Sequence, residues 1–363
     1  MQEQTIPDRL KISPFLIFYV IMAMQIGLGA LDYQRIIAKD AGYDAWISIV
    51  FAGTCLHIIV WMIYKIAKIV NGDIVTAHMY VAGNLIGKVL SFPFIFYFLL
   101  HSLASLRTLF EILQVWIFPT LNLFWFSLGY MLLSMYVVFG GLRTVVGIAF
   151  FSLVLPAFLV FTFFPNLLYS NFESLLPIFD HSVKDLIKGS FHMSLPFIGF
   201  EVVLFLYPFI KESQKSEKWA HLGLLATTFL YTILAILTFA FFSEGQLQKV
   251  MWPTLMMWKI FKLSFVERFE FIGIAFWNLI ILPNVCISIW IGSRLVKRIF
   301  KIRQKKGVYL LIIAQLGMIT FIHTREEINL LNSLMAKVGF AFTMLYIPLL
   351  FIAVYIVKKV KKK

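Results

Sequence analysis

The sequence has few charged residues and almost no cysteine. Only 14% of its 363 residues are charged, and only two are cysteines, Cys55 and Cys286. Both cysteines lie within long apolar runs, so neither a disulfide framework nor a metal site is indicated. Phosphate-binding glycine loops, dinucleotide-binding fingerprints, HExxH zinc motifs and nucleophile elbows are also missing. We therefore expect neither an enzyme nor a bound cofactor or metal.

Apolar residues, in contrast, are abundant. Hydrophobic residues make up 61% of the chain, and the mean hydropathy is +0.87. A soluble domain cannot bury that share in its core. A membrane-spanning helix needs about 20 mostly apolar residues, and about ten such runs are present. They lie near 12–31, 44–64, 89–117, 122–140, 143–163, 190–210, 219–242, 265–292, 307–322 and 334–357.

Runs of this length and continuity do not fit the alternating strands of a membrane barrel. The expected fold class is therefore an all-α integral membrane protein of about ten transmembrane helices. We expect one transmembrane domain over residues 1–363, with a first half over about 12–163 and a second half over about 190–357.

The net charge of +14 is not evenly distributed. Lys and Arg gather between residues 294 and 306 and again in the tail 358–363. If the N-terminus is cytoplasmic, most basic residues fall on the cytoplasmic side, as the positive-inside rule requires. This predicts a multi-pass protein with both termini cytoplasmic. It also explains the basic tail by anionic lipid headgroups, with no nucleic-acid partner.

Two spans are interrupted by residues that weaken helices. Gly27 and Gly29 lie in the first run, and Pro196 and Gly199 lie in the sixth. With ten spans counted as five plus five, these are the opening helices of two halves. Interruptions at matching positions indicate an inverted-repeat transporter fold with discontinuous helices, whose freed backbone groups can bind a ligand. The alternative is that the glycines only allow close helix packing.

Glu201 is an ionisable residue within the sixth run. Such a residue is expensive in a membrane and usually faces the protein interior. We expect it to contact a substrate ammonium group or to relay a proton. The alternative is a carboxyl group that only joins helices by hydrogen bonds.

The third and eighth spans carry further polar residues. Tyr97 and His101 are four residues apart and share a helix face, as do Arg107 and Glu111. The first pair is a candidate for lining a cavity, and the second is predicted to form a structural ion pair. The eighth span places three residues along one inward face, namely Trp277, Asn284 and Ser288.

The sequence resembles the B subunits of bacterial spore germinant receptors, in the endospore germination permease family of the amino acid, polyamine and organocation transporter superfamily. The resemblance runs nearly end to end and rests on four segments in order. They are GLGALDYQRIIAKDAGYDAWISIVF from residue 27, FGGL at 139–142, FIGFEVVLFLYPFIK from 197, and WPTLMMWKIFKLSFVERFEFIGIAFW at 252–277. One departure is visible, because many relatives have a proline just before the arginine that matches Arg35, where this chain has Tyr33 and Gln34.

The resemblance implies a LeuT-type five-plus-five inverted repeat and a site in the spore inner membrane. It also implies two partner subunits, an A subunit and a lipoprotein C subunit, and a small germinant, usually an amino acid. The family's ligand pocket then falls on Gly27, Gly29, Tyr97, His101, Ile198, Gly199, Asn284, Ser288 and Phe342. Glu201 joins this set through its place beside Gly199.

Three functions fit these features. The first is a germinant-sensing subunit that binds a small amino acid or similar nutrient at the two breaks and signals to its partners. The second is a proton-coupled amino-acid permease in which Glu201 or His101 titrates. The third is a structural subunit with a vestigial site.

Overall fold

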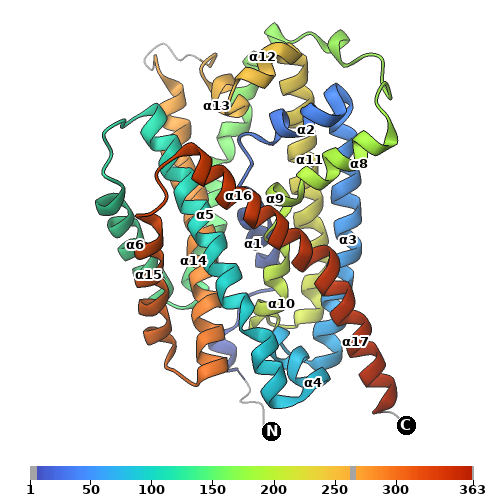
Figure 1. Ribbon diagram of the computed structural model, residues 1–363, viewed down its shortest axis with the longest axis vertical. Coiled ribbons are helices and arrows are strands. Elements are labelled where there is room, and N and C mark those ends of the chain that lie inside the picture. Colours follow the sequence, from blue (N-terminus) through green and yellow to red (C-terminus); the bar gives the residue numbers. More distant parts are fainter. Residues whose placement is uncertain (1–5, 262–266, 362–363) are drawn as a thin grey trace.

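The chain folds into a bundle of helices, most of which run along the long axis of the molecule (Figure 1). The computed structural model describes residues 6–261 and 267–361, and within them the extended pairing is a single bridge between Ile12 and Ile210. The expected all-α class is thus confirmed. The start of the predicted run 265–292, part of the segment 252–277 and the last two residues of the basic tail lie outside the described residues.

The helices follow the predicted runs closely. In the first half they are α1 (Leu16–Gln25), α2 (Tyr33–Ala41), α3 (Ala45–Val70), α4 (Ile74–Ser91), α5 (Pro93–Trp116), α6 (Leu123–Phe139) and α7 (Leu142–Val154), which continues as the 3₁₀ segment η3 (Leu155–Tyr169). In the second half they are α8 (Val183–His192), α9 (Ser194–Phe197), η5 (Phe200–Val202), α10 (Val203–Leu206), α11 (Glu217–Phe241), α12 (Glu244–Lys249), α13 (Pro253–Trp258), α14 (Phe269–Phe300), α15 (Gln304–Ile319), α16 (Arg325–Phe340), the π-helical η8 (Ala341–Tyr346) and α17 (Ile347–Val360).

Six helices in the described residues are long and apolar enough to cross a membrane, or seven if the bent pair Val183–His192 and Ser194–Phe209 is one span. The apolar helices α1 and α6 are shorter. The count of ten spans and the boundaries of the two halves therefore stay predictions. A multi-pass membrane protein is nevertheless evident, because large apolar residues such as Leu85 and Tyr136, each 78% exposed, cover the outside of the bundle.

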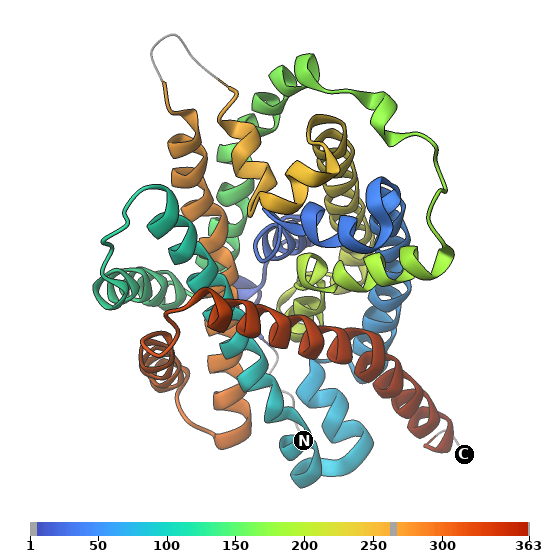
Figure 2. The same cartoon turned by 45° about the horizontal axis from the view of Figure 1, so that its top comes forward.

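The centre of the bundle is built around the first helix. α1 packs against α11 and α7, while α14 packs along α5 and α7. α16 crosses in front of these helices and contacts α5, as Figures 1 and 2 both show. This packing places the end of α1 deep inside the protein, where Met24 and Gln25 are at most 1% exposed.

Both described ends of the chain lie at the same end of the bundle (Figure 1). Here the segment before α1 is tied to the segment after α10. The amide of Ile12 donates to the carbonyl of Phe209 at 2.8 Å, and the amide of Lys211 donates to the carbonyl of Ile12 at 2.9 Å. Arg143 of α7 donates to the carbonyl of Lys11 at 3.0 Å. The ends of the two interrupted spans on this side of the bundle are therefore joined directly.

An ion pair closes the same end of the bundle between α4 and α14. One oxygen of Asp73 accepts from Arg298 Nη1 at 2.6 Å. The other caps α4 by accepting from the amide and the hydroxyl of Thr76, both at 3.0 Å. Asp73 thus has two separable roles, as a helix cap and as the partner of a cation.

Comparing Asp73→Ala with Asp73→Asn separates these roles. Asparagine keeps an oxygen that caps α4, whereas alanine leaves the Thr76 amide without its partner. We expect Asp73→Asn to retain about 1 kcal/mol more unfolding free energy than Asp73→Ala, which is the usual worth of an N-cap. Denaturation of the purified variants measures the difference. Equal stabilities would show that the cap contributes nothing here.

Candidate functional site

The first break follows α1. The helix ends at Gln25, and regular helix resumes only at Tyr33, where α2 begins. Gly29 lies in the intervening segment with φ +74°, a conformation that side chains with a Cβ rarely adopt. Gly27 lies against Asn284, because a Cβ built on Gly27 would come within 2.7 Å of Asn284 Oδ1. The predicted discontinuity of the first span is confirmed, and within it Gly29 adopts a conformation that favours glycine while Gly27 allows Asn284 to approach closely.

The second break separates α9 from α10. Gly199 has φ +125°, between the last residue of α9 and the 3₁₀ turn η5. Its amide has no helical acceptor and donates instead to Glu201 Oε2 at 2.7 Å. Pro196 lies inside α9 and contributes no amide hydrogen. The predicted discontinuity of the sixth span is confirmed as well.

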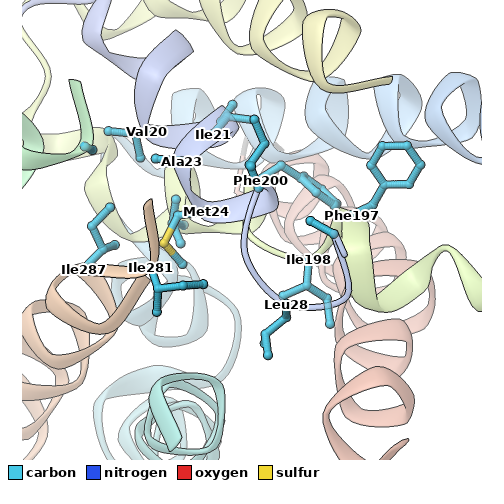
Figure 3. Close-up of a cluster of buried hydrophobic side chains, with 14 of the residues drawn as sticks. Val20, Ile21, Ala23, Met24, Leu28, Phe197, Ile198, Phe200, Ile281 and Ile287 are labelled. Carbon is cyan, nitrogen blue, oxygen red and sulfur yellow. The ribbon is translucent and has the colours of Figure 1, made fainter. Parts of the chain in front are cut away.

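The two breaks face each other, and buried apolar side chains pack around them (Figure 3). A Cβ on Gly199 would lie 2.5 Å from the Cβ of Met24 and 2.8 Å from its carbonyl carbon. A Cβ on Gly29 would lie 3.2 Å from Pro196 Cγ. Both alternatives raised by the sequence therefore apply, because the glycines allow the helices to break and also allow the two broken segments to pack closely.

At the breaks, several backbone carbonyls that have no helical partner accept hydrogen bonds from side chains. Gln25 Nε2 donates to the carbonyl of Phe197 at 2.9 Å. The Tyr231 hydroxyl donates to the carbonyl of Gln25 at 2.6 Å and approaches that of Pro196 at 3.4 Å. Sequence reasoning expected these backbone groups to be free for a guest molecule. In the structure they are internally bonded, so a guest has to displace these side chains or use other groups.

Tyr231 of α11 is a site residue that the sequence analysis missed. It is 1% exposed and contacts both breaks, and its own carbonyl accepts from the Tyr33 hydroxyl at 2.6 Å. A signal was available, since a tyrosine buried within an apolar span needs a partner for its hydroxyl. The partner's identity depends on how α11 packs against α1, and this cannot be read from the chain.

Removing the Tyr231 hydroxyl tests this contact. In Tyr231→Phe the carbonyl of Gln25 loses a donor at 2.6 Å. The Gln25 carbonyl still accepts from the Gly27 amide at 2.9 Å, so we expect the free energy of unfolding to fall by about 0.5–1.5 kcal/mol, the usual net worth of one hydrogen bond. Tyr130→Phe is a matched control, because the Tyr130 hydroxyl donates to the carbonyl of Asn278 at 3.1 Å, away from the breaks. If Tyr231→Phe were as stable as the wild type, the Tyr231 hydroxyl would not contribute to the site.

Glu201 is fully buried at the second break. Its Oε1 accepts from the Tyr97 hydroxyl at 2.7 Å, and its Oε2 accepts from the Gly199 amide. The carboxyl group therefore joins α5 to the broken span by hydrogen bonds, which is the structural alternative raised by the sequence. A role toward an ammonium group or a proton stays a prediction.

Polar side chains of α5 and α14 continue the site. His101 Nδ1 lies 3.0 Å from Ser288 Oγ. One turn earlier on α14, Asn284 Nδ2 donates to the carbonyl of Ala23 at 2.8 Å, near the end of α1. Within the described residues three buried atoms of this region have no hydrogen-bond partner, namely Gln25 Oε1, His101 Nε2 and Asn284 Oδ1. Buried polar atoms of this kind are rare and mark positions where a polar ligand or water can bind.

The remaining predicted residues line the side toward η8. The ring of Phe342 packs edge-to-face on Tyr97, with centroids 5.1 Å apart. The side chain of Ile198 fills the space over Gly339. All ten predicted site residues thus lie around the two breaks, and all are buried except Gly29, which is partly exposed.

One prediction for α5 is wrong. Arg107 does not pair with Glu111 but donates to the carbonyls of Ile322 at 2.9 Å and His323 at 3.0 Å. Glu111 pairs instead with Arg325 at the start of α16. Neighbours on one helix face are available to each other, but the incoming segment before α16 offers partners with better geometry.

Solved structures with similar folds place this architecture in a known class. The structure of MHP1, a nucleobase-cation-symport-1 family transporter in a closed conformation with bromovinylhydantoin bound, matches with a TM-score of 0.64 and 13% identity over 98% of this chain and 80% of that one. MhsT in complex with L-phenylalanine matches with a TM-score of 0.66 and 16% identity over 94% of this chain and 87% of that one. The protein therefore has the LeuT-type transporter fold.

The family is shown by sequence. Residues 11–330 match the spore permease family, described as "Spore germination protein", and the chain belongs to it. Spore germination protein GerQB of Bacillus cereus is 40% identical over 347 residues, which are 96% of each chain. Spore germination protein A2 of Bacillus subtilis (strain 168) is 22% identical over 83% of this chain and 84% of the relative. The family is one of germination proteins and permeases and is not an enzyme class.

Proposed function

We propose that this protein is the germinant-sensing transmembrane subunit of a spore germination receptor. Its ligand is a small amino acid or a similar nutrient bound at the two facing breaks. The observation that carries the proposal is the group of buried, unpartnered polar atoms on Gln25, His101 and Asn284 around the first break. Membership in a family of spore germination proteins supports the biological role.

The chemistry of these atoms suits an amino acid. Gln25 Oε1 and Asn284 Oδ1 are acceptors for an ammonium group, and His101 Nε2 either donates or accepts according to its tautomer. At the second break the Gly199 amide already donates to the Glu201 carboxyl group, so a ligand carboxylate has to displace this group or bind elsewhere. MhsT, which shares the fold, holds L-phenylalanine. The proposed ligand site comprises Gly27, Gly29, Tyr97, His101, Ile198, Gly199, Glu201, Asn284, Ser288 and Phe342, together with Gln25 and Tyr231.

Signalling follows from the bonds that join the breaks. Gln25 connects α1 to the carbonyl of Phe197, and Tyr231 connects the carbonyls of Gln25 and Pro196 to α11. A ligand that takes over the polar groups of Gln25 alters how the two broken spans hold each other. It shifts the protein toward another state only to the extent that it binds that state more tightly. That shift is what the partner subunits detect.

The location and partners belong to the same proposal. The protein resides in the spore inner membrane with both termini cytoplasmic, beside an A subunit and a lipoprotein C subunit. The position of both described chain ends at one end of the bundle is consistent with this orientation (Figure 1). The lysines in the last turn of α17, Lys358 and Lys359, fit the cytoplasmic face.

Spores carrying exchanged site residues test the proposal. We expect Asn284→Ala and His101→Phe to raise the amino-acid concentration needed for germination by about tenfold, equivalent to 1.4 kcal/mol of binding. The test uses a panel of amino acids, because both residues are expected to alter preference as well as sensitivity. Ser134→Ala is a matched control, since Ser134 is a buried serine whose hydroxyl donates to the carbonyl of Tyr130 on the same helix. If site variants changed only the amount of assembled receptor and never the response to amino acids, the subunit would be structural.

A second candidate function is proton-coupled transport of the same ligand. The observation that favours it is Glu201, a fully buried carboxyl group whose two hydrogen-bond donors, Tyr97 and the Gly199 amide, are both uncharged. Such a group can change its protonation state during a transport cycle. Uptake of radiolabelled amino acid into proteoliposomes under a pH gradient distinguishes the two functions. Binding without uptake leaves the sensor, and uptake that is lost in Glu201→Gln establishes the transporter.

A further inference from the structure

A cavity lies beside the sixth-span break. Its volume is about 250 Å³, and it lies between α3, the α8–α9 bend and the start of η8. Its lining includes Ala52 and Cys55 of α3, Phe197 and Ile198 at the break, and Thr343 of η8. None of the polar atoms left unpartnered at the first break belongs to it. It shares Ile198 with the proposed germinant site and is otherwise lined by different side chains.

The local geometry explains why the cavity exists. The segments Val183–His192 and Ser194–Phe209 are bent by 49°. On the opposite wall, η8 is π-helical, and π-helical segments occur frequently at functional sites. Two irregular segments that face one regular helix, α3, cannot fill all the space between them.

The cavity offers no free hydroxyl group. The single hydroxyl proton of Ser190 is shared between the carbonyls of Ser48 and Leu186, which lie 3.0 Å and 2.9 Å from Oγ. Thr343 Oγ1 donates to the carbonyl of Gly339 at 2.8 Å, and Ser194 Oγ bonds to the carbonyl of Phe191. The rest of the lining is aliphatic, aromatic or sulfur-containing. Since a polar ligand would lose its water without gaining partners, the occupant has to be apolar.

The mouth of the cavity opens on the outer surface of the bundle. Its rim carries Phe51, Ile187 and Phe191, which are 52%, 54% and 44% exposed. Cys55 is ten residues into α3, about 15 Å along the helix axis. The hydrocarbon core of a bilayer is about 30 Å thick, so a cavity at this depth opens to lipid. The molecules that surround its mouth are acyl chains.

We propose that this cavity is a lipid site that takes the acyl chain of a membrane phospholipid against the broken sixth span. The lipid-facing surface continues from the exposed rim to residues that are otherwise inaccessible, namely Met193, Phe197 and Ile198, at 0%, 2% and 3% exposure. Because Phe197 and Ile198 form both the cavity wall and the break, a change in the break alters the cavity. An acyl chain that fits this shape stabilises the bent arrangement of α9, by the same rule of differential affinity that applies to any ligand.

Photo-crosslinking with a modified lipid tests the proposal. The full chain is reconstituted in nanodiscs of phosphatidylcholine with a diazirine near the end of one acyl chain, illuminated, digested and mapped by mass spectrometry. We expect crosslinks on Met193, Phe197 or Ile198, in addition to the open surface at Leu349, which is 64% exposed. In Ala52→Phe, which fills the cavity, the crosslinks at 193–198 are expected to fall about tenfold relative to those at Leu349.

The Leu349 crosslink reports that each variant is in contact with lipid. If Ala52→Phe does not fold, the smaller filler Ala52→Leu replaces it. Absence of crosslinks at 193–198, or crosslinks that persist at full strength in the filled variant, overturns the proposal. The proposal is also overturned if the cavity takes up a free apolar solute instead of a lipid. This outcome is seen when indole protects Cys55 from N-ethylmaleimide and no acyl crosslink forms. Cys286 is fully buried, so Cys55 is the thiol that reports.

Discussion

Gly199→Ala is expected to be the most damaging single-methyl change in the protein. Gly199 has φ +125°, and an added Cβ would lie 2.8 Å from the carbonyl carbon of Met24. The clash is with backbone, so no side-chain rotation relieves it. Backbone strain of about 1–3 kcal/mol adds to overpacking of about 1–3 kcal/mol. We expect little folded protein in the membrane, and a midpoint of thermal unfolding far below that of the wild type for any that is recovered.

Gly147→Ala is the matched control for this experiment. Gly147 lies in α7, and an added Cβ would meet nothing within 4 Å. Since alanine favours a helix over glycine by about 1 kcal/mol, this variant should be as stable as the wild type or slightly more stable. Equal stabilities of the two alanine variants would mean that the breaks are not held as closely together as the structure shows.

Glu201→Ala is expected to have the second largest effect. It removes the acceptor for the Gly199 amide and for the Tyr97 hydroxyl, both at 2.7 Å. Leaving a buried donor unsatisfied costs about 1–3 kcal/mol, so two of them amount to about 2–6 kcal/mol of unfolding free energy. Glu201→Gln retains one acceptor oxygen and should lose about half as much. Chemical denaturation of the purified variants in detergent measures the series.

A double-mutant cycle with Tyr97→Phe shows whether the bond to Tyr97 is responsible. Tyr97→Phe alone removes one donor and leaves the carboxylate bonded to Gly199. If the two side chains act through this bond, the double variant loses less than the sum of the single losses, by at least about 0.5 kcal/mol. Strict additivity would place the role of Glu201 entirely at the Gly199 amide.

The position of the breaks was predictable because it depends on local chemistry. Glycines at 27, 29 and 199 and a proline at 196 weaken a helix wherever it packs, and the structure breaks at both places. The chemistry that completes the breaks was not predictable in the same way. Tyr231 is more than 200 residues from Gln25 in sequence, and only the packing of α11 against α1 brings them together.

The α5 residues illustrate the same limit. Spacing of four residues placed Tyr97 with His101 and Arg107 with Glu111 correctly on shared faces. It did not indicate which partners each would find. Tyr97 binds Glu201 and His101 binds Ser288, whereas Arg107 and Glu111 bind the segment that leads into α16. The helix face on which a side chain lies limits which residues it can reach. The packing of the neighbouring helices then determines its hydrogen-bond partner.

The bridge at Ile12 has a mechanical consequence. Because the backbone of Ile12 is bonded to Phe209 and Lys211, the segment before α1 and the segment after α10 are coupled to each other. Arg143 donates to the carbonyl of Lys11 and so holds the segment before α1 against α7. Any movement of one of these segments has to carry the other with it or break the hydrogen bonds between them. A rigid protein fused just ahead of Ile6 is therefore expected to restrict the movement of both segments without touching the ligand.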